Sequence, residues 1–175
     1  ENIKTKAPEL EAFIMGRQFE GCDGYKTVIG QIQIPDEARG AVSVLQEAAR
    51  LQAMGMTVKF EITSAGNAGA PKYDIDLAAI APGTQVIHCY AVKRVGLNKL
   101  TQRLGEAARQ LANYVPPSGW TVVRVVAIHV NDGSDDDYRT QKMQGTKDVI
   151  TNNTQIDEFR IVLASGTIVQ APGDL

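Results

Sequence analysis

The stretch YDIDLAAIAPGTQVIHCYAVK, Tyr73 to Lys93, decides the fold that this sequence predicts. It holds two runs with strand character, YDIDLAAI and QVIHCYAVK, and the Pro-Gly pair between them is typical of a turn. The pattern therefore predicts two neighbouring strands joined by a tight turn. Because alternate side chains of a strand share a face, Asp74 and Asp76 point the same way, and Ala91 and Lys93 do so on the second strand.

The rest of the chain is divided by the same reasoning. Apolar residues at helical spacing predict helices, and alternating or continuous apolar runs predict strands. The predicted elements are a helix over 7–20, a strand over 27–34, a helix over 36–55, a strand over 58–63, the strand pair of 73–93, a helix over 96–114, a strand over 120–130 and a pair of strands over 159–169. Residues 64–72 are predicted to be a loop, and residues 131–154 form a polar segment for which no helix or strand is predicted. The run Asp135 to Asp137 fits no calcium-loop spacing and is predicted to be a solvated loop.

Composition and charge set limits on function. The 175 residues are 43% hydrophobic and 22% charged, which is ordinary for one soluble globular domain. A net charge of −2 gives no overall basic field of the kind that attracts nucleic acid. No apolar run approaches the roughly 20 residues of a membrane span, and no signal peptide is present. The chain begins with Glu1 rather than Met, which predicts a fragment of a longer protein.

Carboxylates close to a lysine are the residues that metal-dependent phosphodiester hydrolysis needs. Asp76 precedes an apolar run on the first strand, and Lys93 would lie across from it on the second. Glu47 shares a predicted helical face with apolar residues, where a charge is rare without a partner or a metal. The alternative for Glu47 is a solvated pair with Arg50 or Arg39.

Two histidines and a cysteine in the apolar strands are candidates for other chemistry. His129, within an apolar strand, is predicted to be a hydrogen-bonded structural residue rather than a general base, and the same holds for His88. Cys89 is predicted to be a small buried hydrophobic residue. His88 and Cys89 are adjacent on a strand, point to opposite faces and therefore cannot form a nucleophile–base pair.

The order of helix glutamate, strand, aspartate, Ala91 and Lys93 resembles the core motif of the PD-(D/E)XK nuclease superfamily. In that motif one strand carries the aspartate, the next carries Glu-x-Lys, and the carboxylates hold a divalent metal. The resemblance covers roughly residues 36 to 114 and extends to archaeal Holliday-junction resolvases, restriction endonucleases and nuclease domains of bacterial contact-dependent inhibition toxins. It implies an α/β fold with a central mixed sheet flanked by helices and a restriction-endonuclease-like core of order α-β-β-β-α-β.

The resemblance also implies one nuclease-like domain over 1–175 and roles for particular residues. Residues 1–34 would form an N-terminal helix and strand, 36–130 the core and 131–175 a C-terminal extension. Glu47, Asp76 and position 91 would hold Mg²⁺ or Mn²⁺, with Zn²⁺ a further option, and Lys93 would position the attacking water or stabilise the transition state. Asp74 and Glu61 are secondary candidates. The alternative for Glu61 is a surface residue on the outward alternation of its strand, and for Asp74 and Asp76 it is the polar face of an edge strand. Phosphate contacts are expected from four basic residues: Arg94, Lys99, Arg103 and Arg109.

Ala91 departs from the motif, because the family has glutamate at this position. A methyl group cannot ligate a metal, so the chain as written is expected to cleave poorly or not at all. The surrounding Cys-Tyr-x-Val-Lys-Arg is otherwise intact. We therefore interpret Ala91 as a deliberate replacement of a native glutamate that permits production of a toxic nuclease. A natural, degenerate member that binds without cutting is the alternative.

The expected function is a metal-dependent endonuclease that hydrolyses phosphodiester bonds in DNA or tRNA, inactive here through Ala91. The expected subclass is a bacterial contact-dependent growth inhibition toxin, exported as part of a larger protein and acting in the cytoplasm of the target cell. Its partner would be an acidic immunity protein that covers the active site. The alternative from another class is a non-catalytic interaction module, such as an immunity or adaptor protein with a degenerate nuclease-like fold.

Overall fold

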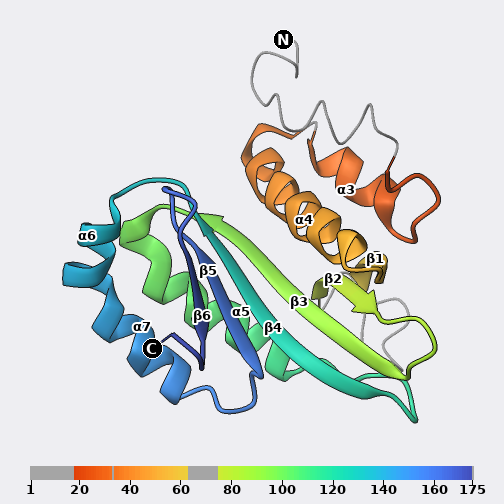
Figure 1. The fold of residues 1–175 in the computed structure, drawn as a ribbon. Coiled ribbons are helices and arrows are strands. Elements are labelled where there is room, and N and C mark those ends of the chain that lie inside the picture. The colour runs from red at the N-terminus through yellow and green to blue at the C-terminus, as the bar shows by residue number, and fades with distance from the viewer. Residues whose placement is uncertain (1–17, 33, 63–74, 175) are drawn as a thin grey trace.

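The computed structural model describes residues 18–32, 34–62 and 75–174 of the chain. The predicted loop over 64–72 and the candidate Asp74 lie outside the described residues, as does most of the predicted helix over 7–20. The described strands are β1 (Thr57–Ile62), β2 (Ile75–Ile80), β3 (Val86–Val95), β4 (Thr121–Val130), β5 (Glu158–Val162) and β6 (Ile168–Ala171). They form one open six-stranded sheet in the order β1-β2-β3-β4-β5-β6 (Figure 1).

Helices cover both faces of this sheet. The helical elements are α3 (Tyr25–Ile32), α4 (Pro35–Ala53), the 3₁₀ turn η1 (Leu97–Lys99), α5 (Leu100–Ala112), the short α6 (Asp135–Asp137), the π-helical turn η2 (Tyr138–Lys142) and α7 (Met143–Thr151). α3 and α4 lie on one face, and α5 lies on the other, where it packs against α7 (Figure 1). The predicted class, a mixed sheet flanked by helices, is confirmed.

The sheet is mixed because its strands run in both directions. β1, β2 and β3 are antiparallel neighbours, β3, β4 and β5 are parallel, and β6 returns antiparallel to β5. The chain from Pro35 to Val130 therefore runs helix, three strands, helix, strand. The predicted hairpin is confirmed: Leu77 pairs with Tyr90 and Ile80 with Ile87, and Gly83 in the turn has a φ of 77°.

Two apolar layers, one on each face, hold the sheet. The layer under α4 includes Leu45, Leu51, Phe60, Leu77, Tyr90, Val92 and Ala127. The layer under α5 includes Cys89, Ala91, Leu100, Leu104, Leu111, Val126 and Ile128. The apolar stripe predicted for the second long helix is buried in this layer, because residues three and four apart share one side of a helix. A strand buried on both faces reads as a continuous apolar run, as β4 does at its centre.

The predicted strand over 27–34 is wrong, because most of this segment is the helix α3. Its apolar residues fit both periods, and Val28 and Ile32, four apart, are the ones that become buried. The free edge of β1 is already occupied: the backbone N–H of Phe60 donates to the carbonyl of Asp23 at 2.8 Å. The segment after Asp23 folds over the apolar layer under α4, where Val28 and Ile32 are buried.

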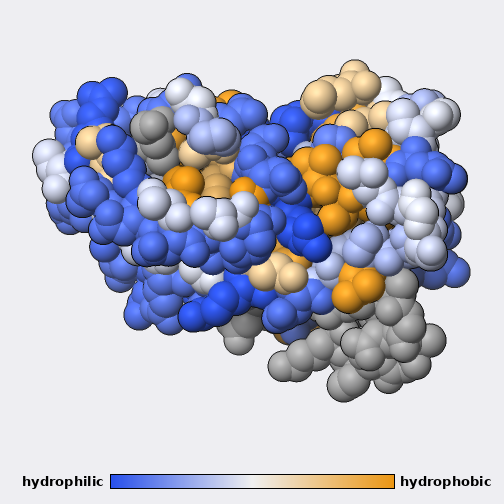
Figure 2. Space-filling model, turned by 90° about the horizontal axis from the view of Figure 1, so that it is seen from below, coloured by the Kyte–Doolittle hydropathy of each residue, from blue (hydrophilic) through white to orange (hydrophobic). Residues whose placement is uncertain are grey.

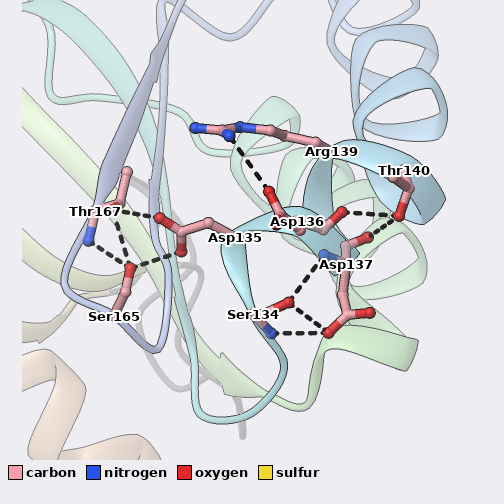
Figure 3. Close-up of polar contacts among 8 residues, drawn as sticks. All are labelled: Ser134, Asp135, Asp136, Asp137, Arg139, Thr140, Ser165 and Thr167. Atoms are coloured by element: carbon pink, nitrogen blue, oxygen red, sulfur yellow. Dashed lines mark hydrogen bonds and ion pairs between the residues drawn. The ribbon is translucent and has the colours of Figure 1, made fainter.

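The polar segment 131–154, for which no helix was predicted, contains α6, η2 and α7, so the loop predicted for Asp135 to Asp137 is wrong. Ser134 and Asp137 form a capping box that starts the helical segment. The Asp135 carboxylate accepts hydrogen bonds from the hydroxyls of Ser165 and Thr167, both at 2.7 Å, and these bonds lower its pKa (Figure 3). The aspartate run thus caps a helix and fastens it to the turn between β5 and β6.

Gly24 lies where the backbone before α3 passes close to β1, so a side chain there is expected to be costly. It has a φ of +77°, and a Cβ atom there would lie 2.1 Å from the carbonyl oxygen of Phe60. Gly24→Ala is expected to lower the free energy of unfolding by about 2 kcal/mol or more, since both the clash and the left-handed backbone oppose a side chain. Urea unfolding measures this. The control is Gly30→Ala within α3, where the new methyl group meets no atom within 4 Å. Equal effects of the two changes would contradict the prediction.

Hydrophilic side chains cover most of the face shown in Figure 2, and hydrophobic residues gather there only in small groups. In the part of the chain that the structure describes, no helix has the length and apolar character needed to cross a membrane.

Candidate functional site

Asp76 and Lys93 meet between β2 and β3. The Lys93 ammonium donates to Oδ2 of Asp76 at 3.2 Å, and the backbone N–H of Val92 donates to the same oxygen at 2.7 Å. The two side chains are 17% and 32% exposed, so the pair is partly shielded from water. The regular pairing of β2 with β3 stops at Leu77 and Tyr90. The Asp76 carboxylate therefore bridges the two strands at the point where they separate.

Position 91 borders this pair. Continuing the register of Leu77 with Tyr90 by one residue in each strand sets position 91 opposite Asp76. Ala91 lies two residues before Lys93, hence on the same face of β3, and it is fully buried. A longer side chain at position 91 would begin beside the Asp76 carboxylate.

Glu61 of β1 lies near enough to Asp76 for the two carboxylates to interact electrostatically. Burial raises its pKa to about 7, and the nearby negative charge of Asp76 adds to this rise. Its backbone has a φ of +52°, the left-handed region that residues with a side chain rarely adopt. Regular pairs flank it on both sides, Phe60 with Leu77 and Ile62 with Ile75, but Glu61 itself is outside the ladder. The side chain of the secondary candidate Glu61 contacts α3, where Nε2 of Gln31 donates to its Oε1 at 3.2 Å.

Glu47 is elsewhere, and the expected convergence of Glu47 with Asp76 and Lys93 is wrong. Its Oε1 lies 2.9 Å from Nε2 of His129 and 3.1 Å from Nε of Arg160, and its Oε2 lies 2.9 Å from Nε of Arg50. With 2% exposure, the carboxylate is buried and fully engaged by these partners. The partner that a buried charge requires is therefore supplied by protein side chains.

The sheet separates Glu47 from Lys93. Side chains of β3 alternate, with Ala91 in the apolar layer under α5 and Val92 in the layer under α4. Lys93 therefore shares the α5 face with Ala91, and Arg94 points to the α4 face. Arg94 is in register with His129, which contacts Glu47. The predicted pairing of Glu47 with Arg50 is present, but it is buried rather than solvated.

The environment of Glu47 explains its role in stability. Although burial raises its pKa, the hydrogen bond to His129 and the charges of Arg50 and Arg160 lower it to about 2. Glu47 is therefore ionised at neutral pH and joins α4 to β4 and β5. The interpretation of His129 as a hydrogen-bonded strand histidine agrees with this contact.

A pH dependence follows from this carboxylate. The pKa of Glu47 is about 2 in the folded protein against 4.5 ordinarily, so the unfolded chain binds more protons between these values. The contribution of Glu47 to stability is present above pH 4.5 and is lost as the pH falls toward 2, a change of about 3 kcal/mol over that window. Urea unfolding at pH 4.5, 3.5 and 2.5 measures it. Glu47→Gln should remove this part of the slope, and a slope unchanged by Glu47→Gln would contradict the assignment.

The four basic residues expected to contact phosphate do not gather at one place. Arg94 points to the face opposite Lys93, whereas Lys99 lies in η1 and Arg103 and Arg109 lie on the exposed side of α5. Arg103 is paired with Glu106 at 2.6 Å. Lys99, Arg103 and Arg109 therefore remain the candidates on the α5 side of the sheet.

The donors beside Lys93 fit a metal ion only in part. Asp76 and Glu61 offer the carboxylate oxygens that Mg²⁺ and Mn²⁺ prefer, and Mg²⁺ commonly keeps several waters beside one or two carboxylates. In residues 18–32, 34–62 and 75–174, no three His, Cys, Asp or Glu side chains group closely enough to hold a metal ion. A glutamate at position 91 would add a third carboxylate next to Asp76.

Comparison with protein families, with curated proteins and with solved structures finds no match for this chain. The assignment of the site therefore rests on the geometry of the described residues. Sequence reasoning missed Gln31, which donates to Glu61, because its segment was predicted to be a strand. It also missed Arg160 as a partner of Glu47, since no local pattern links residues so far apart in the sequence.

Proposed function

We propose that this chain is a metal-dependent nuclease domain of the PD-(D/E)XK type, inactive here through Ala91. The observation that carries the proposal is the contact of Asp76 with Lys93 where the pairing of β2 with β3 ends. Position 91 would face Asp76 if the register of Leu77 with Tyr90 continued by one residue. The element order α4, β1, β2, β3, α5, β4 supports the proposal, because the resemblance to this superfamily implies the order α-β-β-β-α-β. Glu61 replaces Glu47 in the proposed donor set.

The residues at this site would bind the metal, orient the attacking water and stabilise charge in the transition state. Asp76, Glu61 and a glutamate at position 91 would hold Mg²⁺ or Mn²⁺, which lowers the pKa of bound water and neutralises phosphate charge. Lys93, held by Asp76, would orient the attacking water or stabilise negative charge that develops on the phosphate oxygens. The half-buried setting strengthens these interactions relative to open water.

The biological part of the proposal concerns toxin function. We propose a bacterial contact-dependent inhibition toxin domain that cleaves DNA or tRNA in the cytoplasm of the target cell and is neutralised by an immunity protein. The alanine at position 91, where the motif has glutamate while Asp76 and Lys93 match it, supports this, because replacing that glutamate would abolish toxicity and keep the fold. An immunity protein that covers the site would be expected to complement the basic residues of η1 and α5.

The test is the Ala91→Glu protein, incubated with plasmid DNA and with tRNA in the presence of Mg²⁺, Mn²⁺, Zn²⁺ or a chelator. Cleavage that requires a divalent metal supports the proposal. Failure to cut either nucleic acid with any of the three metals, in a folded protein, overturns it.

One observation favours the second candidate, a non-catalytic interaction module. Ala91 is fully buried and belongs to the apolar layer under α5, as a natural core residue would. In that case Ala91→Glu should destabilise the protein without creating metal binding or cleavage. The residue that the native gene encodes at position 91 also separates the two candidates, since an acidic residue supports the enzyme and alanine supports the module.

A further inference from the structure

We propose that Asp174 closes the edge of the sheet at β6 and thereby prevents β6 from pairing with β6 of a second copy of this chain. β6 is the last strand of the sheet, and among the described strands it pairs only with β5. An edge strand presents backbone N–H and C=O groups to which another strand can add. This edge is separate from the strands that carry Asp76 and Lys93, so the proposal does not depend on nuclease activity.

Asp174 supplies both of the groups that a neighbouring strand would offer to Gln170. Oδ2 of its carboxylate accepts a hydrogen bond from the backbone N–H of Gln170 at 2.8 Å. Its own backbone N–H donates to the carbonyl of Gln170 at 2.7 Å. In an antiparallel edge strand, the backbone groups of a residue point either to the paired strand or to the open side. The groups of Gln170 therefore point to the open side, and Asp174 occupies both of them.

Pairing with a second copy would need these same groups. Because backbone direction alternates along a strand, Ile168 directs its N–H and C=O to the same open side as Gln170. The side chain of Ile168 is 46% exposed. If two copies of β6 paired antiparallel about Val169, Ile168 of each copy would face Gln170 of the other and exchange both backbone hydrogen bonds. Such a contact is two-fold symmetric, with the same surface used by both copies.

The space beside this edge is not filled by the neighbouring helices. A cavity of about 330 Å³ lies there, lined by Ile168 and Val169 of β6, by Asp174, and by Tyr138 of η2 and Met143 of α7, among others. Side chains of an added strand could enter this cavity. Closure of the edge at Gln170 is therefore the task of Asp174.

The other edge of the sheet is closed in a similar way. The carbonyl of Asp23 accepts a hydrogen bond from the backbone N–H of Phe60 in β1 at 2.8 Å, and its carboxylate pairs with Lys59 at 2.9 Å. Covering segments and edge lysines are means by which proteins avoid strand addition. Both ends of the sheet are thus covered by a segment of the same chain that carries an aspartate.

The experiment is sedimentation velocity on the present chain and its variants at concentrations from micromolar to about 1 mM, the range in which open strand edges associate. The present chain is expected to be monomeric throughout. Asp174→Ala should shift toward a dimer as the concentration rises. Asp174→Asn keeps an oxygen acceptor and should remain monomeric. Asp136→Ala is the matched control, because it removes the same charge from an aspartate whose side chain is 87% exposed.

Amide hydrogen exchange identifies the strand that pairs. In dilute Asp174→Ala, the Gln170 amide should exchange about tenfold faster, because it loses a hydrogen bond to a charged acceptor. The Val169 amide, which points to β5, should be unchanged. At high concentration the amides of Ile168 and Gln170 should both become protected. A monomeric Asp174→Ala protein at about 1 mM overturns the proposal. So does equal association of Asp136→Ala, or a dimer in which these two amides stay unprotected.

Discussion

Ala91→Glu is expected to raise metal-dependent phosphodiester cleavage about 10³-fold or more over the present chain. The new carboxylate would begin opposite Asp76 and complete a set of three with Glu61, close to the Lys93 ammonium. A metal held there supplies several kcal/mol of transition-state stabilisation, and each 1.36 kcal/mol is about tenfold in rate. Initial rates on supercoiled plasmid and on tRNA, with Mg²⁺ or Mn²⁺, measure the change.

The controls test which atoms matter. Ala91→Gln has nearly the same size without the charge and should remain inactive. Adding Lys93→Met or Asp76→Asn to Ala91→Glu should return the rate to that of the present chain. Lys59→Met is the matched control for Lys93→Met, because Lys59 of β1 also pairs with an aspartate, Asp23, at 2.9 Å. It should have little influence on the rate. Full activity after Lys93→Met would refute the assignment of the site.

Glu47→Ala is expected to lower the free energy of unfolding by about 3–5 kcal/mol, the usual cost of removing one partner from a buried charge network. Glu47 is 2% exposed, and its loss leaves Arg160 and His129, which are 12% and 13% exposed, with uncompensated donors. Chemical unfolding at pH 7 measures the change.

A matched pair on α5 provides the control for this effect. Glu106 pairs with Arg103 three residues away, just as Glu47 pairs with Arg50, but on the exposed side of its helix. Glu106→Ala should leave stability nearly unchanged. In the Ala91→Glu protein, Glu47→Ala should also preserve Mn²⁺ affinity. If Glu47→Ala abolished Mn²⁺ affinity without lowering stability, Glu47 would be a metal ligand. The conclusion that the sheet separates Glu47 from Lys93 would then be wrong.

The pairing of Asp76 with Lys93 could be predicted from the sequence because it depends on two strands that are neighbours along the chain. A tight turn and the alternation of side chains along a strand decide which residues of a hairpin face each other. Both features depend only on residues close together in the sequence. The partners of Glu47 could not be predicted from the sequence in this way. His129 and Arg160 lie 82 and 113 residues further along the chain, and only the packing of α4 across β4 and β5 brings them to it.

By itself the sequence determined the helices α4 and α5, the strands β1 to β4 and the facing of Asp76 and Lys93, since apolar periodicity and turn residues encode them directly. Tertiary structure alone decided that the segment of Gln31 is a helix and that Glu47 is held by His129 and Arg160. The physical reason is that a short apolar run fits either period until its neighbours are in place. A buried carboxylate likewise takes whichever positive or metal partner the packed sheet brings to its face.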